Sequence, residues 1–297
     1  FWGTTFSANY KKDNIDLLVG GALNRYQGAH IKDLLWAEKA YTSYKNNYSY
    51  EGLNTKEEAS GFAKLTYTLN SKWSLFADMQ LRYVNYEAKK YKVNEALYNF
   101  NPKMGVSFNL NPNNSFYLSY ARATKEPNRS DYKDYAKELK KNALAKKPVA
   151  EKLNDFELGW RYQSDKVVLN VNGYYMGYQD QLIPTGKLNE TGYSIRENVG
   201  SSYRSGIEAD ATVHLSTKWV WQPNVAFSKN ITKDYKTEKK KVITYWGDTQ
   251  ISYSPSAVIG NTISFLPIKN FQASLISKYV GSQYIDNTQR EEAKLDA

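Results

Sequence analysis

The stretch Ile207-Glu208-Ala209-Asp210-Ala211-Thr212-Val213-His214-Leu215 places apolar side chains on one parity and polar side chains on the other. This period of two is that of a β-strand with one apolar and one polar face. A helix built from the same residues would spread its apolar side chains around the whole cylinder. The same alternation recurs at 63–69, 104–110 and 156–162. The chain is therefore predicted to be an all-β protein.

The connections between the predicted strands alternate in length. Short turn-forming segments lie at 70–71, 111–114, 164–165, 216–217 and 269–270, and long polar connections at about 28–57, 88–98, 125–151, 184–192, 231–247 and 285–294. This alternation places all short turns at one end of the sheet and all long connections at the other. The strands are therefore predicted to run up and down, as in a membrane β-barrel with short periplasmic turns. A soluble sandwich would have Greek-key connections without this alternation.

The strand count depends on residues 248–268, which contain Ser254-Pro255-Ser256. This segment is either two strands or one long strand with a proline-containing bulge. Two strands would place the polar segment that follows Tyr284 at the short-turn end, although it has no turn-forming character. We therefore expect one long strand and about 12 strands in all, with a new strand beginning near Leu295.

Composition narrows the possible classes of protein. The chain has 297 residues, no cysteine and two histidines. The lack of cysteine excludes disulfide scaffolds and thiol catalysis, and two histidines argue against a multi-histidine metal centre. The mean hydropathy is -0.68, and no apolar run approaches the roughly 20 residues of a membrane-spanning helix. A membrane barrel stays compatible, because alternating strands average to a polar score.

Aromatic residues make up 15% of the chain, and 26 of them are tyrosines. Their positions fit two girdles, one at each membrane interface. The turn-end set is Trp73, Phe116, Tyr162, Trp219 and Trp221, and the loop-end set is Tyr120, Tyr175, Tyr178, Tyr203 and Tyr279. The alternative is an aromatic core in a soluble β protein.

The most specific motif is Asn198-Val199-Gly200-Ser201-Ser202-Tyr203-Arg204-Ser205-Gly206-Ile207-Glu208. Further segments accompany it, in order along the chain: 20–30, 122–129, 151–159 and 278–287. Together they resemble the barrel of TonB-dependent outer-membrane receptors, over essentially the whole chain. The resemblance implies an antiparallel up-and-down transmembrane β-barrel in the outer membrane of a Gram-negative cell.

The same resemblance implies a larger protein. Barrels of this family have about 22 strands and a plugged lumen, so residues 1–297 are expected to form part of a single barrel domain. The plug, with its TonB-binding motif, is not among these residues. A partial barrel leaves two strand edges unpaired, which hydrocarbon cannot satisfy. We therefore expect that the chain does not fold autonomously.

Charged residues in the strands are expected to face the lumen, because Arg or Lys at the lipid midplane costs about 2–4 kcal/mol. We predict a lumenal charge network of Glu157, Arg161, Arg204, Glu208 and Asp210. A structural ion-pair role is favoured over substrate binding.

The long connection 125–151 carries the candidate ligand site. The charge spacing of Ser130–Leu139 is compatible with a short helix. Loops of this length are often binding elements or lids, and a surface segment without a ligand is the alternative. Arg129, Tyr132 and Tyr135 are the predicted ligand contacts.

The predicted function is import of a scarce nutrient, such as a ferric siderophore, haem, cobalamin or glycan, with energy coupled through TonB by way of the plug. Other expected partners are outer-membrane lipid, lipopolysaccharide and a surface lipoprotein. The alternative is a passive pore or surface-binding barrel. No catalytic motif is present, so no enzyme activity, cofactor or metal site is expected.

The net charge of +10 and the lysine-rich runs at 133–147 and 233–241 raise a further possibility, a soluble nucleic-acid-binding protein. Solvated external loops near lipid phosphates account for the same lysines, and no nucleic-acid recognition motif accompanies them. Nucleic acid is therefore not an expected partner.

Overall fold

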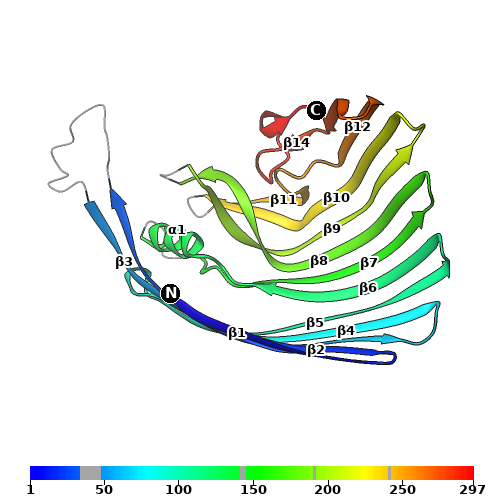
Figure 1. Ribbon diagram of the computed structural model, residues 1–297. Coiled ribbons are helices and arrows are strands. Elements are labelled where there is room, and N and C mark those ends of the chain that lie inside the picture. The colour runs from blue at the N-terminus through cyan, green and yellow to red at the C-terminus, as the bar shows by residue number, and fades with distance from the viewer. Residues whose placement is uncertain (34–47, 141–144, 190–191, 240–241) are drawn as a thin grey trace.

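A computed structural model of the chain describes residues 1–33, 48–140, 145–189, 192–239 and 242–297. Strands dominate it, and from β1 to β10 each strand pairs with the next one in the chain (Figure 1). The strands are β1 (Trp2–Lys12), β2 (Ile15–Asp33), β3 (Tyr48–Thr68), β4 (Trp73–Ala88), β5 (Val93–Asn111), β6 (Asn114–Lys125), β7 (Glu151–Gln163), β8 (Val167–Leu188), β9 (Ser194–His214), β10 (Trp219–Lys239), β11 (Val242–Gln250), β12 (Ala257–Ile268), β13 (Phe271–Val280), β14 (Gln283–Tyr284) and β15 (Lys294–Leu295). The helical elements are η1 (Lys89–Tyr91), α1 (Arg129–Leu139) and η2 (Glu291–Ala293).

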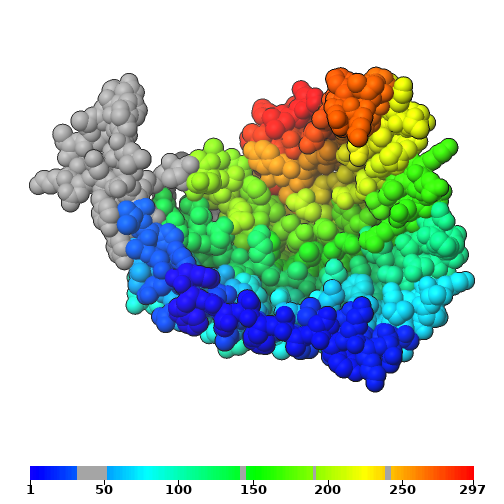
Figure 2. Space-filling view, viewed as in Figure 1, coloured from blue at the N-terminus to red at the C-terminus, as the bar shows by residue number. Residues whose placement is uncertain are grey.

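The main sheet runs in the order β1-β2-β3-β4-β5-β6-β7-β8-β9-β10-β12-β13, with all neighbours antiparallel. It curls into an open trough with β1 and β13 at its two edges (Figures 1 and 2). The predicted antiparallel up-and-down partial barrel is confirmed. No helix among the described residues is long and apolar enough to cross a bilayer.

The segment 248–268 continues in one direction, as predicted. β11 pairs with the C-terminal half of β10, at Ile231–Lys239, and β12 pairs with its N-terminal half, at Trp219–Phe227. The interruption is larger than the expected bulge, because residues 251–256 leave the ladder around Tyr253, whose φ is 53°. β11 and β12 thus occupy one position in the wall. Near Leu295, β15 pairs only with β14, in a separate two-stranded sheet.

Most of the predicted long connections turn out to be strand. The segments 88–98, 184–192 and 231–247 consist largely of the paired ends of β4 and β5, β8 and β9, and β10 and β11. β2 and β3 also extend into 28–57, of which 34–47 lie outside the described residues. The expectation of loops there was wrong because backbone pairing continues after the apolar alternation stops. Loss of an apolar face marks where a strand meets water on both sides, and not where it ends.

The convex face carries cross-strand aromatic pairs at two levels. The turn-end pairs are Trp73–Phe108, Phe116–Trp160 and Trp219–Phe265, and the loop-end pairs are Tyr83–Tyr98, Tyr120–Phe156 and Tyr175–Tyr203. On β4, Trp73 and Tyr83 are about ten residues apart, roughly 33 Å along the strand and 25 Å along the membrane normal at a usual tilt. This is the height of a membrane barrel's apolar band. Tyr178, predicted for the loop-end girdle, instead has the parity of Met176 and faces the concave side.

The concave face repeats one packing device on alternate strand pairs. An aromatic ring stands directly opposite a glycine and lies across it, so the missing side chain gives the ring its place. The pairs are Phe62 with Gly20, Phe76 with Gly105, Tyr117 with Gly159 and Tyr174 with Gly206. At Gly206 an added Cβ would lie 2.4 Å from the backbone oxygen of Phe227 and 2.8 Å from the Tyr174 hydroxyl. The motif glycine is thus explained by close approach of chain segments.

Candidate functional site

Helix α1 forms within the connection between β6 and β7. Asn128 begins it with a capping box, since its side chain accepts from the backbone N–H of Asp131 at 3.1 Å and the Asp131 carboxylate accepts from the backbone N–H of Asn128 at 2.7 Å. The short helix expected within Ser130–Leu139 is confirmed, with its first residue at Arg129.

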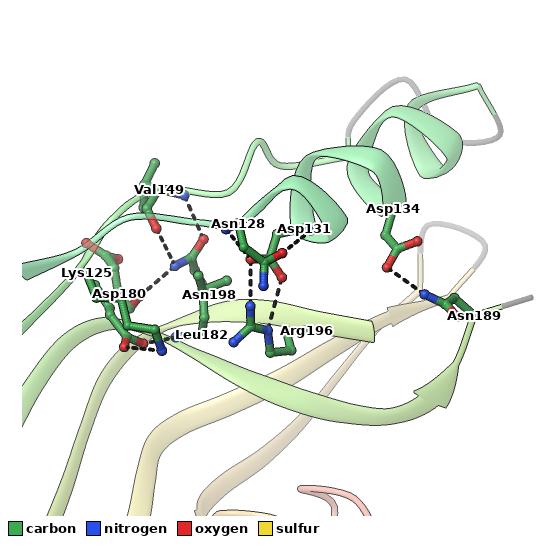
Figure 3. A network of polar contacts seen from close by, with 11 residues as sticks. Lys125, Asn128, Asp131, Asp134, Val149, Asp180, Leu182, Asn189, Arg196 and Asn198 are labelled. Carbon is green, nitrogen blue, oxygen red and sulfur yellow. Dashed lines mark hydrogen bonds and ion pairs between the residues drawn. The ribbon is translucent and has the colours of Figure 1, made fainter. Parts of the chain in front are cut away.

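An ion pair ties α1 to β9 (Figure 3). Arg196 donates from Nη2 to Asp131 Oδ2 at 2.7 Å and from Nε to Oδ1 at 3.0 Å, and only 4% of the Asp131 side chain is exposed. Asn189 adds a longer contact to Asp134, at 3.5 Å. Two-point contacts of this kind fix orientation as well as distance.

A second contact, an aromatic stack, holds the next residue of α1. Tyr132 lies on Tyr86 of β4, with ring centroids 5.7 Å apart and planes inclined by 20°. Tyr132 is 2% exposed and belongs to a small cluster with Ala88 and Val93. Burial raises the pKa of the Tyr132 phenol, so the ring is neutral at physiological pH. The helix therefore bridges β4 and β9 across the loop end of the trough (Figure 1).

The chain that returns from α1 to the wall is also anchored. Asn198 Oδ1 accepts from the backbone N–H of Val149 at 2.9 Å, while its Nδ2 donates to the carbonyls of Val149 at 3.0 Å and Asp180 at 2.6 Å (Figure 3). One side chain on β9 thus joins the end of the β6–β7 connection to β8. This gives the first residue of the Asn198–Glu208 motif a physical role.

A cluster of four charged residues lies where α1 leaves the wall. Arg82 on β4 donates to Glu58 on β3 from Nε at 2.7 Å and from Nη2 at 3.0 Å. It also donates to Glu126, just beyond β6, from Nη1 at 2.8 Å and from Nη2 at 2.9 Å. Lys56 lies 2.8 Å from Glu126 and 3.6 Å from Glu58. Burial raises the pKa of Glu126, but the hydrogen bonds from Arg82 and Lys56 outweigh it and lower the pKa to about 2.

Sequence reasoning did not identify this four-residue cluster. Lys56 and Glu58 share one parity of β3, and Glu126 lies in the segment 122–129 that supported the family resemblance. Those signals were present, but nothing in the sequence connected them with Arg82.

The five predicted lumenal charges lie on the concave face, as their parity requires. Within the described part of the chain, none of Glu157, Arg161, Arg204, Glu208 and Asp210 makes an ion pair. Three of the five have neutral partners instead. Arg161 lies 5.0 Å from the centre of the Tyr117 ring, Asp210 accepts from Asn170 at 2.9 Å, and Arg204 donates to Asn230 at 3.1 Å and Ser254 at 3.0 Å. Arg161, Glu208 and Asp210 also line one recess of about 390 Å³.

The predicted ligand residues Arg129, Tyr132 and Tyr135 all belong to α1. Arg129 and Tyr135 are partly exposed, whereas Tyr132 is buried in its stack with Tyr86. Ligand contact by these three residues stays a prediction. No cluster of three or more metal-ligating side chains occurs among the described residues.

Beyond the wall, residues 284–293 fold back over the outer ends of the strands. Asn287 is fully buried, and it accepts from the backbone N–H of Ser252 at 2.8 Å and donates to the carbonyl of Pro184 at 2.7 Å. Beneath it, the Tyr235 hydroxyl donates to Glu197 at 2.9 Å. Burial raises the pKa of Glu197 despite this bond. The β8–β11 rim is therefore a packed unit.

Comparison with known proteins places these features in a family context. The family model for the "TonB dependent receptor-like, beta-barrel" matches residues 1–296. No curated protein sequence matches the chain significantly.

Three solved structures show the same fold. The ferric yersiniabactin uptake receptor FyuA from Yersinia pestis is 15% identical with a TM-score of 0.62, covering 98% of this chain and 44% of that one. The copper transporter OprC is 16% identical with a TM-score of 0.68, covering 99% and 44%. The siderophore receptor PiuA from Acinetobacter baumannii is 15% identical with a TM-score of 0.66, covering 96% and 47%. The chain spans less than half the length of these proteins.

Proposed function

The chain belongs to the TonB-dependent receptor β-barrel family of the outer membrane, and we propose that it forms part of the wall of a receptor that imports a scarce nutrient with TonB-coupled energy. The candidate cargoes are ferric siderophores, haem, cobalamin and glycans. Similar structures named as a ferric yersiniabactin uptake receptor and a siderophore receptor support the first of these.

The observation that carries the proposal is the placement of α1. A loop without a role in binding needs no fixed position, whereas α1 is fixed on two sides, through Asp131 to β9 and through Tyr132 to β4. Its position across the loop end of the trough is where a cargo would arrive from outside. Arg129 and Tyr135, which are partly exposed, are the proposed contacts, and Tyr132 is proposed to hold the helix in place.

Import of this kind also requires the remainder of the barrel, a plug and the TonB complex. Residues 1–297 are taken as part of one barrel domain, and the polar concave face is suited to contact a plug that communicates with the TonB complex. Lipid, lipopolysaccharide and a surface lipoprotein are the further proposed partners.

Uptake by the full-length receptor in a Gram-negative host lacking its own receptors tests this function. Cells are offered radiolabelled ferric siderophores, haem, cobalamin and a glycan panel. Saturable uptake of one cargo that stops when the proton gradient is collapsed or TonB is deleted supports TonB-coupled import. Uptake that persists after both treatments would establish a passive pore instead.

The site is tested by binding of the imported cargo. Arg129→Gln combined with Tyr135→Phe is expected to weaken binding about tenfold, since a charge-assisted contact is worth roughly 1.5–3 kcal/mol. Lys140→Gln, exposed at the other end of α1, is the matched control. Equal binding by both variants would remove these residues from the site.

A further inference from the structure

Two sites at the short-turn end of the wall have the same arrangement. Each, called a corner below, consists of a lysine and a tryptophan from a turn and a phenylalanine from the adjacent strand. In the β3–β4 turn, Asn70 Oδ1 accepts from the backbone N–H groups of Lys72 at 2.8 Å and Trp73 at 3.0 Å. In the β9–β10 turn, Ser216 Oγ accepts from those of Lys218 and Trp219, both at 3.2 Å. Each turn therefore presents a lysine followed by a tryptophan in the same hydrogen-bonded frame.

The third residue of each corner, a phenylalanine, comes from the adjacent strand of the sheet. The Lys72 carbonyl accepts from the backbone N–H of Asn109 at 2.7 Å, and the Lys218 carbonyl accepts from that of Leu266 at 2.8 Å. These bonds bring the preceding residue, Phe108 or Phe265, beside the tryptophan. The ring centroids are 4.4 Å apart for Trp73 and Phe108, and 4.5 Å apart for Trp219 and Phe265.

The two lysines are exposed, and within the described chain neither side chain makes a hydrogen bond or an ion pair. Both tryptophans are 42% exposed on the convex face. Each corner thus combines an ammonium group available to a ligand with an apolar ring pair, at the level where hydrocarbon meets headgroups.

Lysine is also common in the other short turns. Of the six short turns, four contain a lysine, a fifth directly follows Lys12 at the end of β1, and the turn at 111–114 has none. The five residues are Lys12, Lys72, Lys166, Lys218 and Lys269, all exposed. Short turns of outer-membrane barrels lie on the periplasmic side, so this belt faces the inner leaflet.

We propose that the Lys72–Trp73–Phe108 and Lys218–Trp219–Phe265 corners bind anionic phospholipids of the periplasmic leaflet. The lysine ammonium pairs with the phosphate of the headgroup, while the tryptophan and phenylalanine rings contact the glycerol and the first acyl carbons. The inference rests on the outer-membrane placement and not on import, so it can fail while the transport proposal stands.

The test is native mass spectrometry of the full-length receptor in detergent, titrated with phosphatidylglycerol or phosphatidylcholine. The wild-type receptor is expected to retain phosphatidylglycerol preferentially. In the variant that combines Lys72→Gln with Lys218→Gln, the preference for phosphatidylglycerol over phosphatidylcholine is expected to fall about fivefold per site. This is the effect of one basic residue near an anionic membrane surface, about 1 kcal/mol. The backbone bonds that form each turn remain in this variant, and its folded state is checked by resistance to dissociation in unheated gels.

Two controls make the result decisive. Lys89→Gln combined with Lys140→Gln changes the charge equally at the loop end and is expected to keep the wild-type preference. Millimolar inorganic phosphate is expected not to displace the lipid. An unchanged preference in the Lys72/Lys218 variant, an equal loss in the loop-end control, or displacement by inorganic phosphate would each overturn the proposal.

Discussion

The guanidinium of Arg82 holds the carboxylate of Glu126 by two hydrogen bonds, of 2.8 and 2.9 Å, although 44 positions separate the residues in the chain. Glu126 immediately precedes the short link into α1. The pair therefore fixes the point at which the helix leaves the wall. Because Arg82 also holds Glu58, the loss of Glu126 alone leaves β3 and β4 connected.

Glu126→Gln is expected to destabilise the full-length receptor by about 1–2 kcal/mol, since a partly buried charged donor loses its partner. The measurement is thermal unfolding in detergent, together with hydrogen exchange of the α1 amides. Glu157→Gln, a concave-face carboxylate without an ion pair among the described residues, is the control and is expected to change little. Equal exchange of α1 in both variants would show that Arg82 does not anchor the helix.

The same contact predicts a response to acid. The pKa of Glu126 is lowered to about 2 from an ordinary 4.5, so its stabilising effect is fully present above pH 4.5 and is lost as the pH falls through 2. Hydrogen exchange of α1, corrected for the intrinsic pH dependence, is expected to rise between these limits and to be flat from pH 5 to 8. In the Glu126→Gln variant this acid-induced rise should be smaller than in the wild type, because the Asp131–Arg196 pair is then still left to lose its charge.

Asp131 has two functions in α1, as the acidic residue of the capping box and as the partner of Arg196. Asp131→Asn is expected to cost about 2 kcal/mol in helix docking, because it removes a buried charge opposite a guanidinium and weakens the cap. Asp134→Asn alters the 3.5 Å contact with Asn189 but leaves the capping box and the Arg196 pair in place, and it serves as the control. If both variants bind cargo equally well, docking of α1 is not needed for binding.

Gly206→Ala is expected to reduce the folded yield, because its Cβ would meet the backbone oxygen of Phe227 at 2.4 Å. Overpacking against backbone typically costs about 1–3 kcal/mol. The matched control is Gly200→Ala, on the same strand, where an added Cβ meets nothing within 4 Å. The folded fraction is read from gel mobility before and after heating, and comparable fractions would contradict the packing argument.

Sequence periodicity predicted the faces of the wall well. The positions of Glu157, Arg161, Arg204, Glu208 and Asp210 on the concave side follow directly from a period of two. Tyr178 shows that closeness to the loop end is not enough to assign a residue to the aromatic girdle. Its position along β8 is at the right level, but its parity places it on the concave face.

The partners of those side chains were not predictable in the same way. Asp131 and Arg196 are 65 residues apart, and their contact depends on the direction in which a connection folds over the wall. No local pattern encodes that direction. The identity of each partner was hidden for the same reason, so a residue expected in an ion pair, Arg204, instead donates to Asn230 and Ser254.

The length of the strands has a consequence for how the outer surface can vary. β8 has 22 residues, about twice the 9–11 needed to cross a bilayer, so roughly half of it stands above the lipid as a paired ladder. A residue inserted into such a ladder moves every later side chain to the other face. Antibodies or phages bind to this rim from outside the cell. Against them, the rim can vary by substitution at any exposed position of the ladder, but by insertion or deletion only at the hairpin tips.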